Sequence, residues 1–400
     1  MALPALALGW LLVASAPAVK YKASARVESV VRTRLLTETA PSPVVTDLAL
    51  TPRLDSVLYT SRLEVKFVYE PQFFVRQVGL SPSFEVLQSV YSTGTYALRP
   101  DLKLSATHTT TYGNFPLEGL GGDSGGATSL PGMRTRDNSY IYTETNAGFW
   151  TNLGIKRLAV AGTLGWVVNG LMDPPRRLAQ RGNAVYPQQR YPELRAQANY
   201  GLTPRDYLSF SVYGRDVSYH SVGRRNSILH LSPGLQHQFS PLVGLSIEPG
   251  LALGVEHARL EGSVVMPILE TTLKAPVPLG NHWPVKAKVR AKYLPYLDPL
   301  TTRIIPRGEL GADLEWKGKR EALVLGKLRY ARALTTGPHH ADAQARAELE
   351  ALWPLPLSRY LYVQGKGQLS WTRHGVLSDS PIVQWFTSVG LVVHYDRGRL

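Results

Sequence analysis

The stretch Val285-Lys286-Ala287-Lys288-Val289-Arg290-Ala291-Lys292-Tyr293 alternates strictly between apolar and cationic residues. In a β-strand successive side chains point to opposite faces, so the apolar residues share one face and the four cations share the other. In an α-helix the same cations would be scattered around the circumference, and no apolar stripe would remain to be buried. The stretch therefore predicts a strand with an apolar environment on one side and water on the other.

The same period of two recurs in segments that lie far apart in the chain. Applied from end to end, the rule gives about eighteen segments, the first near Ala25 and the last near Tyr395. A strand that separates lipid from water needs this alternation. The clearest further examples run from Arg62 to Tyr69, from Glu309 to Trp316, from Asp342 to Ala351 and from Leu361 to Trp371.

Short and long connections alternate between these segments. The short ones are Thr60 to Arg62, Arg99 to Asp101, Gly154 to Arg157, Thr203 to Asp206, Ser240 to Leu242 and Lys317 to Arg320. The long ones include Thr111 to Asn138, Leu171 to Arg190, Val217 to Arg225, Leu334 to Ala341 and Arg373 to Pro381. Short periplasmic turns and long extracellular loops are typical of outer-membrane barrels. We therefore expect an all-β fold, a single transmembrane antiparallel β-barrel of about eighteen strands with both termini periplasmic.

The N-terminal residues predict export from the cytoplasm. Residues 1–19 carry no charge and are apolar around Leu11 to Val13, and the small-x-small triplet Ala16-Pro17-Ala18 follows. This pattern is typical of a signal peptide, which gives 1–18 as signal peptide and 19–400 as barrel; an uncleaved anchor is the alternative. The chain has no Cys, so thiolate metal sites and disulfides are excluded. We place the protein in the outer membrane of a Gram-negative bacterium.

The polar faces of the segments supply the candidate residues for the barrel lumen. An eighteen-strand barrel leaves an aqueous lumen unless loops fill it. With a net charge of +14, further cations such as Arg26, Arg32, Arg34, Arg195 and Arg215 would give a field that favours anionic solutes. The candidates are Arg62, Glu64, Lys66, Lys286, Lys288, Arg290, Lys292, Glu309, Asp313, Glu315, Lys327, Arg329, Arg346, Glu348, Tyr362, Gln364, Lys366 and Gln368.

An alternative interpretation of the charged rows is structural. The strand with Glu309, Asp313 and Glu315 directly follows the strand with four cations. Cations and carboxylates directly opposite each other form cross-strand ion pairs, which stiffen a wall without selecting a solute. The glycine-rich residues 119–126, inside the long loop 111–138, either narrow the pore or lie in extracellular solvent.

No pattern indicates an enzyme, a cofactor or a metal. The nearest approach to a Ser-His pair is His220-Ser221 or His230 with Ser232, but adjacent strand residues point to opposite faces. His339-His340 with Asp342 in a loop is more typical of solvated residues than of a metal site. The cations alternate with apolar residues instead of gathering on one wet surface, so we expect no nucleic-acid partner.

The last segment contains an assembly pattern. Ser388, Gly390, Val393 and Tyr395 match the polar-x-Gly-x-x-apolar-x-aromatic signal of outer-membrane proteins. We therefore expect the barrel-assembly machinery and outer-membrane lipid to be partners. Here Asp396 to Leu400 follow the aromatic residue, whereas the usual signal ends on it.

The layout also resembles a family of outer-membrane barrels of myxobacteria, some of which are associated with polysaccharide export. The residues that carry the resemblance are Thr51-Pro52-Arg53-Leu54, Tyr69-Glu70-Pro71-Gln72-Phe73, Thr111-Tyr112-Gly113-Asn114-Phe115 and Tyr296-Leu297-Asp298-Pro299. The resemblance implies an integral barrel of eighteen strands, a polysaccharide substrate and a separate periplasmic polysaccharide-export protein as partner. It carries over no catalytic residue.

These observations leave three functions open. The first is an outer-membrane pore for a secreted polysaccharide, the second a passive diffusion porin for small polar or anionic solutes, and the third a structural barrel occluded by its own loops. A soluble adhesin made of β-sandwiches would also show many strands. It would not show loops of alternating length along the whole chain.

Overall fold

The protein consists of β-strands joined by short connections and loops. The computed structural model describes residues 18–33, 42–80, 82–114, 139–153, 157–171, 188–220, 223–257, 262–278, 284–298, 301–318, 321–335, 342–358, 360–374 and 378–397. The strands are β1 (Ala18–Thr33), β2 (Val44–Tyr59), β3 (Leu63–Arg76), β4 (Ser83–Arg99), β5 (Leu102–Asn114), β6 (Ser139–Asn152), β7 (Leu158–Leu171), β8 (Gln189–Gly201), β9 (Asp206–Tyr219), β10 (Arg224–Ser240), β11 (Val243–Glu256), β12 (Ser263–Pro278), β13 (Pro284–Leu297), β14 (Ile304–Lys317), β15 (Leu323–Ala333), β16 (Ala343–Pro354), β17 (Leu361–His374) and β18 (Ser378–Arg397). Among the described residues there is no helix long and apolar enough to cross a membrane.

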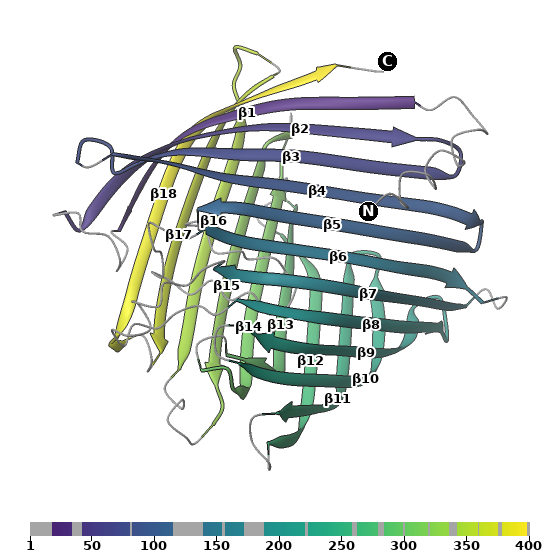
Figure 1. Cartoon of the computed structure of the whole chain (residues 1–400). Helices are drawn as coiled ribbons and strands as arrows, with labels where there is room; N and C mark the ends of the chain where they lie inside the picture. Colours follow the sequence, from purple (N-terminus) through teal and green to yellow (C-terminus); the bar gives the residue numbers. More distant parts are fainter. Residues whose placement is uncertain are drawn as a thin grey trace.

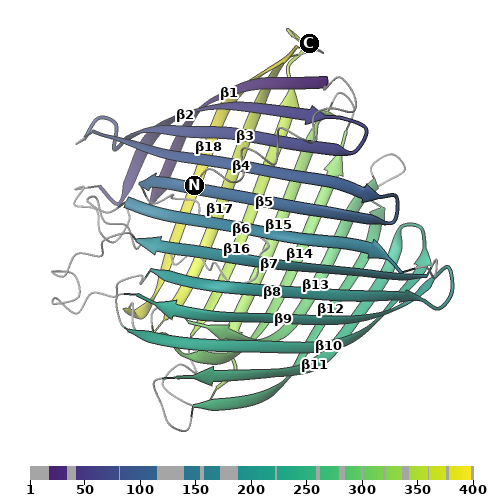
Figure 2. The same cartoon turned by 45° about the vertical axis from the view of Figure 1, so that its right-hand side comes forward.

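The strands form one closed barrel, seen from two directions in Figures 1 and 2. Each strand pairs antiparallel with the next along the chain. The last strand, β18, pairs antiparallel with β1 and closes the ring. The predicted barrel of eighteen antiparallel strands is therefore confirmed. Closure leaves no unpaired sheet edge, as a spanning sheet in lipid requires.

Short turns lie at one rim of the barrel, and side-chain hydroxyls stabilise several of them. In the β2–β3 turn the Thr60 hydroxyl accepts hydrogen bonds from the amides of Arg62 and Leu63, at 3.3 and 3.0 Å. Ser240 in the β10–β11 turn accepts from the amide of Val243 at 3.1 Å. Ser and Thr favour such turns because the hydroxyl replaces a backbone acceptor. The predicted short connections therefore have a local cause in the sequence.

Two connections predicted to be long are short. β9 continues to Tyr219 and β10 starts at Arg224, so the loop expected from Val217 to Arg225 is mostly strand. Its polar residues pair across the hairpin, since the Arg225 guanidinium donates to Asp216 at 2.9 Å. The connection after β17 is likewise confined to residues 375–377.

The two faces of the wall follow from the strand register. Directly opposed residues of antiparallel strands point to the same side of the sheet. Once the inward residues of one strand are known, the register therefore gives the inward residues of every other strand in the ring. Only the concave side lets side chains of non-adjacent strands meet, and there Glu256 of β11 accepts from the amide of Ile304 of β14 at 2.8 Å. The opposite, outer face is apolar: Leu310, Leu328 and Leu349 are 59%, 56% and 58% exposed. A closed barrel with an apolar outside and a polar inside is the architecture of proteins that span bacterial outer membranes.

Candidate functional site: the barrel lumen

Seventeen of the predicted lumen residues lie on strands, on the face opposite the apolar belt. The exception is Arg62, which is exposed in the β2–β3 turn because β3 begins at Leu63. The predicted start of that strand is therefore one residue early. That the predicted lumen residues take part in conduction stays a prediction. The seventeen are Glu64 and Lys66 of β3, Lys286, Lys288, Arg290 and Lys292 of β13, Glu309, Asp313 and Glu315 of β14, Lys327 and Arg329 of β15, Arg346 and Glu348 of β16, and Tyr362, Gln364, Lys366 and Gln368 of β17.

The charged rows of β13 and β14 face each other. The register sets Lys286 opposite Glu315, Lys288 opposite Asp313 and Lys292 opposite Glu309. This confirms the predicted juxtaposition of the two rows. Charged side chains of both signs therefore line the sector of the lumen wall formed by these two adjacent strands.

The ion pairs of these rows join both directly opposed and diagonal residues. Arg290 donates to Asp313 at 2.6 Å, and Arg329 of the next strand donates to the same carboxylate. Lys292 pairs with Glu270 of β12 at 2.8 Å and not with Glu309, which Arg307 holds at 3.3 Å. Long side chains reach diagonal neighbours as easily as opposed ones. These ion pairs therefore tie neighbouring strands together from β12 to β15.

A second charged cluster, which the sequence did not predict, lies at the opposite rim, where β1 and β3 end and β2 and β4 begin. Asp47 accepts from Arg32 Nε at 2.7 Å, from Arg76 at 3.0 Å and from the Gln77 amide at 2.9 Å. Arg76 also donates to Glu85 at 3.0 Å. Both guanidinium groups and the Asp47 carboxylate are at most 2% exposed. We call these residues, Arg32, Asp47, Arg76 and Glu85, the buried network.

The end of the β13–β14 hairpin folds inward across the lumen wall. The Asn226 side chain of β10 donates to the Thr302 carbonyl at 2.6 Å, and Arg224 donates to the Thr301 carbonyl at 3.1 Å. Asp298 shapes the turn, because its backbone carbonyl accepts from the Thr302 amide at 2.8 Å and its side chain accepts from the Thr301 amide at 3.2 Å. Asp298 belongs to the stretch Tyr296-Leu297-Asp298-Pro299 noted in the sequence. That stretch builds an inward turn.

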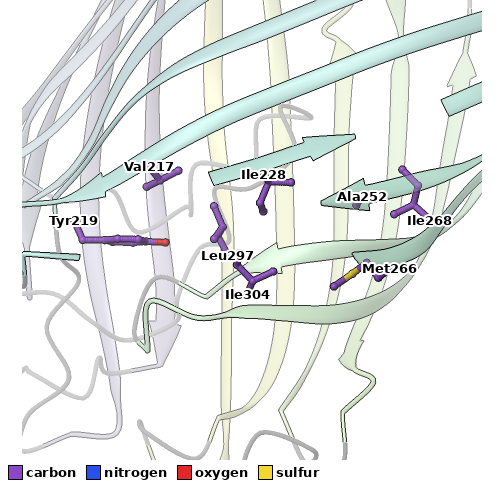
Figure 3. Close-up of a cluster of buried hydrophobic side chains, with 8 residues drawn as sticks. All are labelled: Val217, Tyr219, Ile228, Ala252, Met266, Ile268, Leu297 and Ile304. Atoms are coloured by element: carbon purple, nitrogen blue, oxygen red, sulfur yellow. The ribbon is translucent and has the colours of Figure 1, made fainter. Parts of the chain in front are cut away.

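Apolar side chains hold this hairpin end against the inner wall. Figure 3 shows Leu297 and Ile304 of the hairpin beside side chains of β9 to β12. The cluster comprises Val217, Tyr219, Ile228, Ala252, Met266, Ile268, Leu297 and Ile304, each at most 8% exposed. A Cβ added to Gly254 of β11 would lie 2.9 Å from Ile304 Cδ1, so this glycine permits the close approach. The cluster narrows the lumen near the rim where the buried network lies.

Sequence reasoning missed this constriction, although a signal was present. The inward positions of β10 to β12 include Ile228, Met266 and Ile268, where a wall facing only water would carry polar residues. Apolar residues on the inner face predict that protein covers them. The long loop 111–138, expected either to narrow the pore or to lie in extracellular solvent, has only its first residues, Thr111 to Asn114, among the described ones.

Of the catalytic and metal candidates, His220, His230, Ser232 and Asp342 are among the described residues and the others are not. His230 packs on the Tyr213 ring with centroids 5.3 Å apart, and the Ser232 carbonyl accepts from Ser211 at 3.4 Å. Ser221, His339 and His340 lie outside the described residues, as do 1–17 of the predicted signal peptide. Within the described part of the chain, no group of three or more His, Asp or Glu side chains has the arrangement of a metal site.

Comparison with known proteins gives the family. Residues 10–398 match the EpsX exopolysaccharide export family. The chain belongs to that family. The EpsX match covers the whole barrel, and it agrees with the polysaccharide-export part of the predicted resemblance. The myxobacterial origin stays a prediction, because the match names no organism. No curated protein matches the chain.

Solved structures of other barrels are similar to this EpsX-family chain only in outline. OccAB3 of Acinetobacter baumannii has a TM-score of 0.49 and 10% identity, over 95% of this chain and 99% of that one. OpdL of Pseudomonas aeruginosa has a TM-score of 0.44 and 12% identity, over 96% and 99%. A bacterial polysaccharide outer membrane secretin has a TM-score of 0.35 and 9% identity, over 93% and 98%. At such TM-scores these likenesses add nothing to the fold that the strand pairing establishes.

Proposed function

We propose that this EpsX-family barrel is the outer-membrane pore through which a polysaccharide leaves the cell, fed by a periplasmic polysaccharide-export protein. The observation that carries the proposal is the family match over residues 10–398 of a closed barrel with a polar inner face. A hydrated glycan needs an enclosed wet path across lipid, and an eighteen-strand barrel is wide enough to provide one. In this proposal the glycan passes through the barrel, and the protein catalyses no reaction.

Deletion of the gene, followed by complementation, tests export. We expect the deletion strain to lose surface and released polysaccharide and to accumulate glycan in the periplasm. The complementing chain restores secretion. Unchanged surface polysaccharide in the deletion strain would reject the proposal. A barrel variant that folds but no longer retains the periplasmic partner in pull-down experiments would separate docking of that partner from passage of the glycan.

A passive porin is the second candidate, and the opposed rows of β13 and β14 favour it. Charged side chains that line a pore wall can set the selectivity for small ions. The porin hypothesis predicts steady conductance of the purified chain in planar bilayers and normal polysaccharide in the deletion strain. A barrel that stays closed in the bilayer even without loop 111–138 would instead support the occluded structural role.

The orientation of the barrel belongs to the same proposal, with both termini and the short turns on the periplasmic side. The chain has no native Cys, so single cysteines report directly on exposure. We expect a membrane-impermeant maleimide to label His257→Cys, in the β11–β12 connection, on intact cells. Arg205→Cys, in the β8–β9 turn, should label only after the outer membrane is permeabilised. The reverse pattern would place the termini outside.

A further inference from the structure

The inner wall holds a cavity of about 530 Å³ where β1, β2 and β3 meet β16, β17 and β18. Its lining includes Lys20, near the start of β1, and Val57, near the end of β2. Both lie toward the rim of the short turns, the rim opposite the buried network. The volume falls within the roughly 300–1,000 Å³ of ordinary ligand sites.

The charges around this cavity are unbalanced. Five cationic side chains line it against two carboxylates, Asp55 and Glu70. Arg53 already occupies both carboxylates, because it donates to the two oxygens of Asp55 at 2.8 and 2.9 Å and to Glu70 at 3.0 Å. The bidentate contact with Asp55 and the single contact with Glu70 hold both carboxylates in place. The side chains that line the cavity therefore carry more positive than negative charge.

Lys22 and Lys66 are the two lysines placed to receive an anion. They come from β1 and β3, on either side of the Arg53–Asp55 pair of β2, since Lys22 is opposite Asp55 and Lys66 is opposite Val57. Within the described residues no ion pair joins either lysine to a carboxylate. An ammonium group is a compact point charge that accepts a carboxylate or a phosphate from many directions.

A neutral acceptor on the opposite side of the cavity matches a sugar hydroxyl. Gln364 of β17 is 8% exposed, and its Nε2 donates to Glu350. Its carbonyl oxygen Oε1 is buried and has no hydrogen-bond partner. A buried acceptor without a donor costs free energy unless a ligand or water supplies one. The cavity thus offers cations on one side and a free acceptor on the other.

We propose that this cavity binds anionic sugar units of the exported polysaccharide, with Lys22 and Lys66 pairing with the anionic substituents and Gln364 accepting a hydroxyl. The glycan nature of the ligand rests on the proposed function. The enclosed position inside the lumen favours a threading chain over a folded protein partner. Binding at the rim of the short turns positions the glycan at the start of its passage.

The purified full chain in a planar bilayer tests this proposal. Oligogalacturonate supplies carboxylates, its fully methyl-esterified form is a neutral analogue of the same length, and a phosphorylated oligosaccharide supplies phosphates. We expect saturable block of the ionic current by at least one of the two anionic oligosaccharides, and none by the ester. The two anionic arms tell which substituent the site accepts. Block weakens as salt rises, because exposed charges are screened.

The double variant Lys22→Gln with Lys66→Gln removes the two charges and keeps the length of the side chains. We expect it to weaken block about five- to tenfold, as the loss of two partly exposed ion pairs predicts. The matched control is Lys103→Gln with Lys274→Gln, which removes the same charge from β5 and β12 and should change block less than about twofold. Heat-dependent migration of each variant on gels verifies that the barrel is folded.

Several outcomes would overturn the proposal. Equal weakening by both double variants would assign the effect to the charge of the whole lumen. Equal block by the methyl ester would remove the role of the anion, and equal block by inorganic phosphate or an acidic peptide would remove the role of the sugar. Any of these results leaves export itself intact, because loss of secretion in the deletion strain is a separate observation.

Discussion

Charged residues occur in two regions of the inner wall that differ in their contact with water. In the buried network, Asp47 is fully buried and binds Arg32 and Arg76, which are 2% and 1% exposed. In the rows of β13 to β15, Asp313 also binds two arginines, yet it is 23% exposed and its partner Arg290 is 16% exposed. The same residue types thus form a dry cluster at one place and a wet one at the other. Charges removed from water depend on their partners far more than charges that water still reaches.

The largest effect is expected at the centre of the buried network. Asp47→Ala removes the carboxylate that binds both guanidinium groups, so we expect the free energy of unfolding to fall by about 3–5 kcal/mol. Denaturant titration of the barrel in lipid vesicles measures this change. Asp47→Asn keeps an acceptor and most of the shape, so its loss should be smaller. A loss for Asp47→Ala no greater than that for Asp313→Ala would contradict the comparison.

The inward end of the β13–β14 hairpin, which packs against β9 to β12, gives the next effect. Ile304→Ala leaves a cavity in the buried apolar cluster, and we expect a loss of about 2–4 kcal/mol together with noisier single-channel current. Leu328→Ala on the outer belt is the control, because lipid chains fill the space that it leaves. A quiet channel in the Ile304 variant would show that the hairpin end is held by its hydrogen bonds alone.

Much of the fold could be predicted because membrane strands repeat a simple pattern. The alternation in Val285–Tyr293 predicted both faces of one strand. The facing rows of β13 and β14 could be predicted because the two segments follow each other along the chain. Burial could not be predicted in the same way. Arg32 was expected to be one lumen cation among many, and nothing local to Asp47 shows that residues from three further strands surround it.

The inward turn and the cation-rich cavity were harder to predict for a related reason. Both depend on which strands face each other across the barrel, and alternation in one segment says nothing about that. Of the cavity residues, Lys66 and Gln364 were among the predicted candidates, and Arg26 was among the further lumen cations. Lys22 was not, because the first strand was expected to begin near Ala25, whereas β1 begins at Ala18. An error of a few residues at a strand end therefore hid a charge that matters for the proposed site.

The smallest effect sharpens the comparison between the two regions. Asp313→Ala leaves Arg290 and Arg329 in contact with water, so we expect a loss of only about 1 kcal/mol. In 1 M salt the Debye length falls to about 3 Å, and this loss should shrink toward zero. The loss for Asp47→Ala should persist in 1 M salt, because ions do not reach a fully buried carboxylate. Paired denaturant titrations of both variants, at low and high salt, measure the difference. If salt reduced both losses equally, water and ions would have access to the buried network, and the distinction between a dry and a wet cluster would fail.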